Sequence, residues 1–320
     1  MTPGSLLARL FRVVGTVAAI VLITFLLVHL APGDPVLALA GEHGDPSYYA
    51  FIRQKFGLDR PLSEQLATYV ANVARGDLGR SFVQGRPVAQ VVLERVPATL
   101  LLTVGALVVS TVAGGLLGII SARRAGRRGD LAIRGITLAG DVLPAFTLGQ
   151  LAILGLAYGA GAFPVQGMTD ARRSLTGLAY MGDVAHHLVL PMMVLALGEV
   201  PVIARLVRVG LLDAMEAEYI RTARATGVSE LRVLYHALRN VLLPVTTVIG
   251  ARAGMLFSGA VVVEVLFAWP GLGRLLFDSL QNRDYPVLLG IFVLVSLAVV
   301  LANLFTDLAY HRIDPRLRRA

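Results

Sequence analysis

The sequence contains no cysteine and only one lysine, Lys55, among its 320 residues. The lack of cysteine excludes disulfide bonds and thiolate metal sites. A phosphate-binding loop requires the pattern G-x-x-x-x-G-K-[ST], whereas Lys55 lies in the segment RQKFG. This chain therefore cannot bind ATP by that route, and an ATP-driven process needs a separate subunit for hydrolysis. We expect this chain itself to hold no cofactor.

Catalytic and metal-binding motifs are also missing. The sequence has no G-x-S-x-G pattern, no H-E-x-x-H pattern and no paired catalytic acids. The adjacent His186 and His187 make no metal site by themselves, because neighbouring residues of a helix point apart. We therefore expect no catalytic residue and no metal site, and an intramembrane enzyme is strongly disfavoured.

Charged residues are few, at 16% of the sequence, whereas 56% of the residues are hydrophobic. Together with a mean hydropathy of +0.70, this is typical of an all-α membrane protein with several spans. The net charge of +8 is compatible with nucleic-acid binding. However, the arginines gather at the ends of apolar runs, a pattern of membrane topology. The expected surroundings are lipid, and no nucleic-acid partner is expected.

Six apolar runs predict six transmembrane helices, at 13–30, 98–122, 131–158, 188–204, 245–267 and 287–310. The first run is predicted to be an uncleaved span; a signal peptide is the alternative, since Ala38-Leu39-Ala40 resembles a cleavage site. Prolines 97, 191, 244 and 286 are expected at or near the first turn of an apolar run, where the missing N–H is tolerated. The segment 31–97 is expected outside with helices at 47–56 and 63–75, either contacting a binding protein or simply covering the outer face.

The distribution of arginine predicts the orientation of the chain. Two short loops, at 159–187 and after residue 267, hold only Arg172, Arg173, Arg274 and Arg283. The connections predicted inside, together with both termini, hold 17 arginines, at 9–12, 123–134, 205–239 and 312–319. The positive-inside rule then places both termini in the cytoplasm. Trp269 fits the interfacial aromatic belt.

Several charged residues interrupt the apolar runs. Asp141 and Pro144 lie in the third run, Glu199 and Pro201 in the fourth, and Arg252 and Glu264 in the fifth. An ionisable residue inside a membrane is a functional candidate by default, and a structural hydrogen-bond anchor is the alternative. Arg252 either reaches toward the cytoplasm or pairs with an acid on another span. Candidate residues of a translocation pathway are Asp141, Pro144, Glu199, Arg252 and Glu264.

The segment 218–244 lies between two apolar runs but is too charged to span a membrane. Apolar residues recur at helical spacing up to Thr222 and again from Leu231. Gly227 is suited to end a helix in a left-handed turn, and Ser229 to cap the next helix, with Glu230 in its first turn. We expect two short amphipathic helices, which either dock onto a partner or lie passively on lipid headgroups.

The motifs A-R-A-T-G at 223–227 and H-A-L-R-N-V-L-L-P at 236–244 resemble the signature loop of permease subunits in binding-protein-dependent ABC importers. L-A-P-G-D-P at 30–35, E-V-L-F-A-W-P-G-L-G-R-L-L at 264–276 and the segment 307–316 are similar to the dipeptide, oligopeptide and nickel branch of that family. Thr226 departs from the branch, which often has Lys there.

The resemblance implies a type I importer permease fold with six transmembrane helices and a cytoplasmic coupling helix. Residues 1–96 then form the first helix and the external loop. Residues 97–311 form the permease core, with the coupling loop at 213–243, and 312–320 form the tail. The implied coupling residues, which contact the ATPase, are Arg221, Ala223, Arg224, Ala225, Gly227, Val228, Ser229 and Leu231.

The resemblance also implies the partners and the location of the chain. The partners are a second homologous permease, two ATPase subunits that carry ATP and Mg²⁺, and an extracytoplasmic binding protein. The location is the cytoplasmic membrane of a prokaryote, and the leading substrate class is peptides, with nickel chelates or other small solutes behind. The alternative is a secondary transporter or channel without an ATPase, in which Asp141, Glu199, Arg252 and Glu264 form a relay. Inverted repeats, which often mark such transporters, are not evident.

Overall fold

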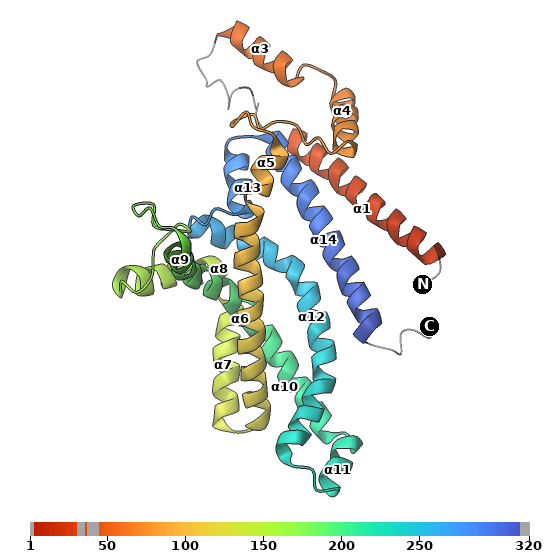
Figure 1. Cartoon of the computed structure of the whole chain (residues 1–320), viewed down its shortest axis with the longest axis vertical. Helices are drawn as coiled ribbons and strands as arrows, with labels where there is room; N and C mark the ends of the chain where they lie inside the picture. Colours follow the sequence, from red (N-terminus) through yellow and green to blue (C-terminus); the bar gives the residue numbers. More distant parts are fainter. Residues whose placement is uncertain (1–2, 31–35, 37–44, 314–320) are drawn as a thin grey trace. The chain divides into compact units, whose positions relative to one another are not determined.

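The computed structural model describes residues 3–30, 36 and 45–313, and over these residues the chain is mostly α-helical without a β-strand (Figure 1). This confirms the predicted all-α class. The chain forms two compact units, one of Met1–Pro97 with Arg274–Ala320 and one of Ala98–Gly273. The division at residues 96 and 311 stays a prediction, and the predicted motif at 31–35 and the tail beyond 313 lie outside the described residues.

The first unit holds α1 (Pro3–Leu30), α3 (Pro46–Phe56), α4 (Leu62–Ala74), α5 (Val88–Leu93) and α14 (Tyr285–Ile313). Both α1 and α5 contact α14. The helices predicted at 47–56 and 63–75 are confirmed as α3 and α4. Asp284, just before α14, accepts hydrogen bonds from the hydroxyl of Ser81 and from the N–H of Phe82, the latter at 2.9 Å. These bonds fix the segment before α5 to the start of α14.

The second unit holds α6 (Val96–Arg123), α7 (Arg128–Val142), α8 (Ala145–Ala152) and a π-helix (Ile153–Gly159), followed by α9 (Gly177–Leu197), α10 (Val200–Glu216), α11 (Glu218–Ala225) and α12 (Glu230–Leu266). At its end α13 (Leu272–Gln281) begins. The backbones of α6 and α10 approach closely at Gly118: an added Cβ there would lie 2.6 Å from the carbonyl oxygen of Ala204 and 2.7 Å from Val207. A small residue at this position is what close helix packing in membranes requires.

The predicted third run, 131–158, is not one straight helix. It is broken into α7 and the α8 segment, which are bent by 104°. Leu143 has an extended backbone (φ −77°, ψ 126°), as expected for a residue before proline, and Pro144 lacks the N–H that would continue the helix. Proline thus turns the chain inside the apolar run, which hydrophobicity alone does not reveal.

Two other predicted helix boundaries are wrong. The run 188–204 is interrupted after Leu197, and α9 begins much earlier, at Gly177, within the predicted loop. Pro191 therefore lies inside α9 rather than in a first turn. Similarly, α12 continues from Glu230 through position 244 to Leu266, so the charged segment and the fifth apolar run share one helix. Prolines 97 and 286 do lie in the first turns of α6 and α14, as predicted.

Two helices of the described chain are long and apolar enough to cross a membrane, Val88–Arg123 and Gly177–Leu197. The bent pair Arg128–Val142 and Ala145–Gly159 adds a third if its halves form one span. Shorter apolar stretches lie in α1, α12 and α14, at Gly15–Leu26, Leu256–Leu266 and Tyr285–Val299. Each of the six predicted runs overlaps one of these segments, but the count of six spans stays a prediction.

Candidate functional site

A left-handed turn at Gly227 separates the short helix α11 from the long helix α12. Gly227 has a φ of +77°, which residues with a side chain rarely adopt. Its N–H donates to the carbonyl of Arg224 at 3.0 Å, and the N–H of Val228 donates to the carbonyl of Ala223 at 3.1 Å. This pair of bonds is a Schellman helix cap. The predicted turn at Gly227 is confirmed, and its role in coupling stays a prediction.

The start of α12 carries an ion pair that bridges this turn. Arg224 Nε donates to Glu230 Oε1 at 2.9 Å, and a second guanidinium nitrogen donates to Oε2 at 3.3 Å. The hydrogen bond from Arg224 holds the pKa of Glu230 below its usual range. Ser229 occupies the position before α12, but its side chain makes no capping hydrogen bond, so that detail of the prediction is wrong. Arg224 is thus bound within the chain.

One side of α11 is buried against α10 and α12. Ile220 has no exposed surface and belongs to an apolar cluster with Val207 and Leu211 of α10 and with Val233 and Ala237 of α12. Full burial of an isoleucine stabilises by about 1.5–3 kcal/mol. The packing makes α11, α10 and the start of α12 one body.

The other side of this body is open and partly apolar. Leu231 is 78% exposed, Tyr235 64% and Tyr219 42%. The spacing of Leu231 and Tyr235 thus marks the outward face of α12, whereas the buried face uses Val233 and Ala237. Of the predicted coupling residues, the structure exposes Arg221, Arg224, Ala225, Gly227, Ser229 and Leu231 and leaves Ala223 and Val228 partly buried.

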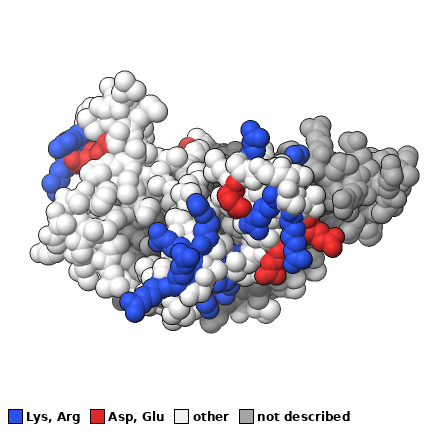
Figure 2. Space-filling model, turned by 90° about the horizontal axis from the view of Figure 1, so that it is seen from below, with Lys and Arg blue, Asp and Glu red and all other residues white. Residues whose placement is uncertain are grey.

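Basic side chains are numerous at the end of the second unit that carries this surface. Figure 2, which views the end of the second unit with the α6–α7 turn and α11, shows more Lys and Arg than Asp and Glu side chains on that face. Exposed arginines of the α6–α7 turn, of α11 and of the start of α12 are Arg123, Arg124, Arg127, Arg128, Arg221, Arg224, Arg232 and Arg239. Such a face attracts acidic groups of a partner. At physiological salt this attraction is largely screened at separations beyond the Debye length of about 8–10 Å.

A buried ion pair between Asp130 and Arg208 joins α7 to α10 and was not predicted from the sequence. The Arg208 guanidinium donates to both carboxylate oxygens, at 2.8 and 2.7 Å. Ser121 at the end of α6 donates at 2.5 Å and the N–H of Gly126 at 3.1 Å. The Asp130 side chain is only 3% exposed. The sequence feature that could have predicted this pair is Asp130, a single acid inside the basic run at 123–134. Arg208 entered the sequence analysis only as evidence for the orientation of the chain.

The predicted pathway charges form separate pairs. Asp141 accepts a hydrogen bond from Arg205 at 3.1 Å, with both side chains at least one-third exposed. Arg252 donates to Glu199 at 2.8 Å, with exposures of 30% and 12%. Pairing was one of the two alternatives predicted for Arg252. Pro144, another of the five pathway candidates, forms the bend between α7 and α8.

Glu264 lies in a third setting, fully buried near the end of α12. The hydroxyl of Thr99 donates to one carboxylate oxygen at 2.6 Å, and the N–H of Gly273 donates to the other at 2.7 Å. Nearby, the indole N–H of Trp269 donates to the carbonyl of Ala98 at 2.9 Å, and Trp269 has no exposed surface. The prediction of an interfacial Trp269 is therefore wrong, because the turn after α12 folds this ring into the core. These contacts make Glu264 a structural anchor for the turn.

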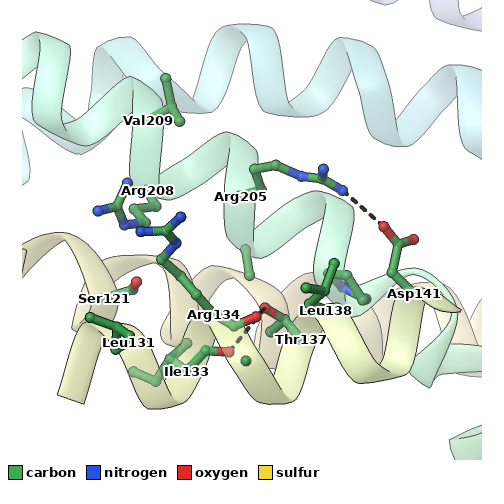
Figure 3. A pocket seen from close by; sticks show the side chains of 13 residues that line it. Ser121, Leu131, Ile133, Arg134, Thr137, Leu138, Asp141, Arg205, Arg208 and Val209 are labelled. Carbon is green, nitrogen blue, oxygen red and sulfur yellow. Dashed lines mark hydrogen bonds and ion pairs between the residues drawn. The ribbon is translucent and has the colours of Figure 1, made fainter. Parts of the chain in front are cut away.

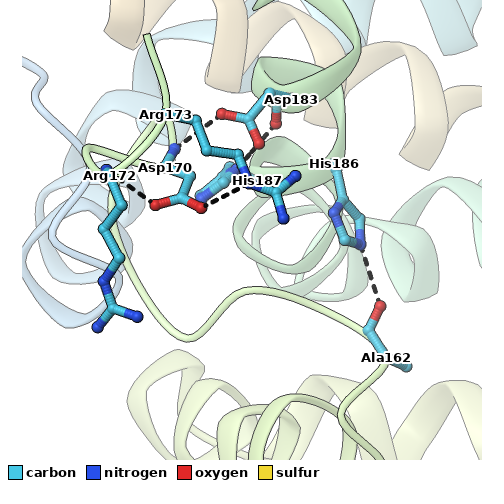
Figure 4. A network of polar contacts seen from close by, with 7 residues as sticks. All are labelled: Ala162, Asp170, Arg172, Arg173, Asp183, His186 and His187. Carbon is cyan, nitrogen blue, oxygen red and sulfur yellow. Dashed lines mark hydrogen bonds and ion pairs between the residues drawn. The ribbon is translucent and has the colours of Figure 1, made fainter. Parts of the chain in front are cut away.

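A polar network at the other end of the second unit involves the adjacent histidines (Figure 4). His187 Nδ1 lies 2.8 Å from the backbone oxygen of Asp183 and 3.4 Å from its carboxylate. The other carboxylate oxygen of Asp183 accepts the N–H of Asp170 at 2.7 Å. His186 instead contacts the carbonyl of Ala162 at 3.0 Å. The two rings have different partners, and the network fixes the loop before α9.

Sequence comparisons match two families over most of the chain. Residues 114–319 match the model described as "Binding-protein-dependent transport system inner membrane component". Residues 5–103 match the N-terminal model, "Binding-prot-dependent transport system membrane comp, N-term". The first match contains the whole α10–α11–α12 region, including the Gly227 turn.

Among curated relatives, the dipeptide transport system permease protein DppB of Escherichia coli (strain K12) is 39% identical over 332 residues, covering 98% of each chain. The glutathione transport system permease protein GsiC of the same strain is 39% identical over 311 residues, covering 97% of each. The di/tripeptide transport system permease protein DppB of Pseudomonas aeruginosa (strain UCBPP-PA14) is 38% identical over 326 residues, also covering 97% of each. The chain therefore belongs to the family of binding-protein-dependent transport system inner membrane components and is a permease subunit of such an importer, not itself an enzyme.

Proposed function

We propose that this chain forms half of the pathway by which an ATP-driven importer moves peptides across the cytoplasmic membrane of a bacterium. The proposed assembly contains a second homologous permease and two ATPase subunits, which carry ATP and Mg²⁺. An extracytoplasmic binding protein delivers the substrate. The chain contributes six spans with both termini in the cytoplasm. Residues 1–96 form the first helix and external loop, 97–311 the permease core and 312–320 the tail.

The observation that carries this proposal is the body formed by α11 with α10 and α12. It buries one face through Ile220 and leaves Tyr219, Leu231 and Tyr235 exposed on the same elements as the exposed arginines Arg221, Arg232 and Arg239. Exposed aromatic side chains with arginine are typical of the centre of a protein–protein interface. We assign this surface to the ATPase subunit, with α11 as the coupling helix.

The packing supports a route by which movement of the ATPase reaches the spans. Displacement of α11 carries α10 with it through the buried contacts of Ile220. The ion pair between Asp130 and Arg208 then links α10 to α7 and to the end of α6. Because packed helices move as rigid bodies, such a displacement favours alternating access over local deformation. ATP binding biases the permease between two packings, and hydrolysis resets it.

The substrate class is inferred from the relatives. Their names give dipeptides, di- and tripeptides, and glutathione, which are all short peptides. We propose short peptides for this importer, with nickel chelates or other small solutes as less favoured cargo. We do not assign the paired acids Asp141 and Glu199 to a proton relay, because each already has an arginine partner.

Uptake by the reconstituted importer tests the proposal. Proteoliposomes are prepared with this chain, its partner permease and both ATPases, and ATP is enclosed in the lumen that the ATPase subunits face. They should accumulate a radiolabelled dipeptide when the binding protein and the dipeptide are added outside. A non-hydrolysable ATP analogue provides the matched control. Uptake that continues without the ATPases would contradict the proposal and favour a secondary transporter.

A further inference from the structure

A cavity of about 600 Å³ lies between α7 and α10 (Figure 3). Its walls include Leu131, Arg134, Leu138 and Asp141 of α7, and Arg205 and Arg208 of α10. The α7 residues recur at intervals of three or four, so they share one face of the helix. Guanidinium groups and leucine side chains therefore meet in the same space.

The charges of this cavity are incompletely balanced. Arg208 is held by Asp130, behind the wall, and Arg205 by Asp141 at 3.1 Å. Arg134 extends from α7 toward α10 (Figure 3) and forms no ion pair within the described residues. One guanidinium is therefore available to an anion. The exposed carboxylate of Asp141 competes for its neighbour Arg205, whose side chain is 63% exposed.

The apolar part of the wall is also uncovered. Leu131 is 67% exposed, Leu138 60% and Val209 of α10 47%. Free phosphate would satisfy the guanidinium groups but would leave these side chains open. A ligand that covers both has an anionic head and a hydrocarbon tail. Basic pockets between membrane helices are known to hold the head groups of anionic lipids.

We propose that this cavity binds an anionic phospholipid, with the phosphate on Arg134, Arg205 as a second guanidinium that Asp141 now holds, and an acyl chain along Leu138. The phospholipid then bridges α7 and α10, the two helices that the pair of Asp130 and Arg208 also joins. The assignment of this lipid to the cytoplasmic leaflet rests on the proposed orientation of the chain, whereas the lipid site itself does not depend on that orientation. Bound lipid and peptide uptake are separate measurements, so either can fail alone.

Native mass spectrometry of the complete importer tests this site. The complex is purified in a neutral detergent and titrated with phosphatidylglycerol or, in parallel, with phosphatidylcholine. Arg134→Gln should weaken the binding of phosphatidylglycerol about fivefold, as expected for one basic residue near a lipid surface, and should leave phosphatidylcholine unchanged. Asp141→Asn should strengthen the binding of phosphatidylglycerol, because it frees Arg205. Arg128→Gln is the matched control, since Arg128 is exposed at the start of α7 but does not line the cavity.

Three results would overturn the proposal. Equal binding of phosphatidylglycerol by the Arg134→Gln variant and the unmodified complex would show that the cavity does not hold the head group. Complete displacement of the lipid by millimolar inorganic phosphate would assign the cavity to free phosphate. Loss of the second permease subunit from the Arg134→Gln complex, with lipid binding unchanged, would assign this face to the subunit interface.

Discussion

The pair of Asp130 and Arg208 offers the most quantitative test of the packing at the arginine-rich end of the second unit. Asp130→Asn keeps the shape of the side chain but removes its charge. Arg208, whose side chain is only 20% exposed, then retains a positive charge without its partner. The hydrogen bonds from Ser121 and Gly126 also become weaker, since an amide oxygen is a poorer acceptor than a carboxylate.

The expected loss of stability is large for a single substitution. Removal of one partner from a buried ion pair costs about 3–5 kcal/mol, because the other charge stays buried. The partial exposure of Arg208 favours the lower end, about 3 kcal/mol. Arg208→Met should cost a similar amount by leaving Asp130 unpaired. The double variant removes both charges, and we expect it to be more stable than the sum of the single losses predicts by at least about 1 kcal/mol.

Reversible unfolding in mixed micelles of a mild detergent and dodecyl sulfate measures these free energies. Arg205→Met serves as the matched control, because its pair with Asp141 is exposed and contributes about 0–1 kcal/mol. Additive losses in the Asp130 and Arg208 variants would refute the reasoning, since they would show that the two side chains do not interact in the folded protein.

The remaining predictions concern the turn and the second charge pair. Gly227→Val should abolish coupled uptake, because the φ of +77° at Gly227 disfavours a residue with a side chain. The variant should still insert into the membrane and keep the helical circular dichroism of the purified chain. Uptake at the normal rate would exclude the turn from coupling. In an NMR titration the carboxyl carbon of Glu230 should titrate below pH 4.5, and Arg224→Gln should return the pKa of Glu230 to about that value. The contribution of this ion pair to folding stability is therefore complete above pH 4.5 and is lost only as pH falls through the lowered pKa. Identical titrations of Glu230 in the variant and the unmodified protein would contradict this pairing. Glu199→Gln should leave ATP-driven peptide uptake independent of a proton gradient, because Glu199 pairs with Arg252 and takes no part in a relay. Uptake that requires a proton gradient in the unmodified importer, and no longer does so in this variant, would support a relay.

Local sequence signals predicted the elements whose cause is local. Gly227 could be identified because a left-handed helix end favours glycine, and the predicted bounds of α3 and α4 lie within one residue of the observed ones. The family resemblance was likewise carried by short motifs at several places. These features depend on neighbouring residues, which the sequence displays directly.

The rest depended on contacts between distant segments. The bend at Pro144 and the continuous helix through position 244 show that proline can either break or accompany a helix, and tertiary packing decides between them. The enrichment of Trp in interfacial aromatic belts favoured Trp269 at a membrane interface, but its N–H donates to the carbonyl of Ala98, 171 positions away. The pair of Asp130 and Arg208, 78 positions apart, was missed for the same reason.

The central claim, that the turn after α11 contacts the ATPase, is tested most directly by cross-linking. The chain has no cysteine, so Ser229→Cys introduces a single thiol at an exposed position beside the turn. The matched control replaces Thr176, which is exposed just before α9, with cysteine. With one engineered cysteine in the groove of the ATPase, we expect a disulfide at position 229 whose yield changes when ATP is added, and none at position 176. The absence of a cross-link at every position from 223 to 231, in a correctly inserted importer, would contradict the account.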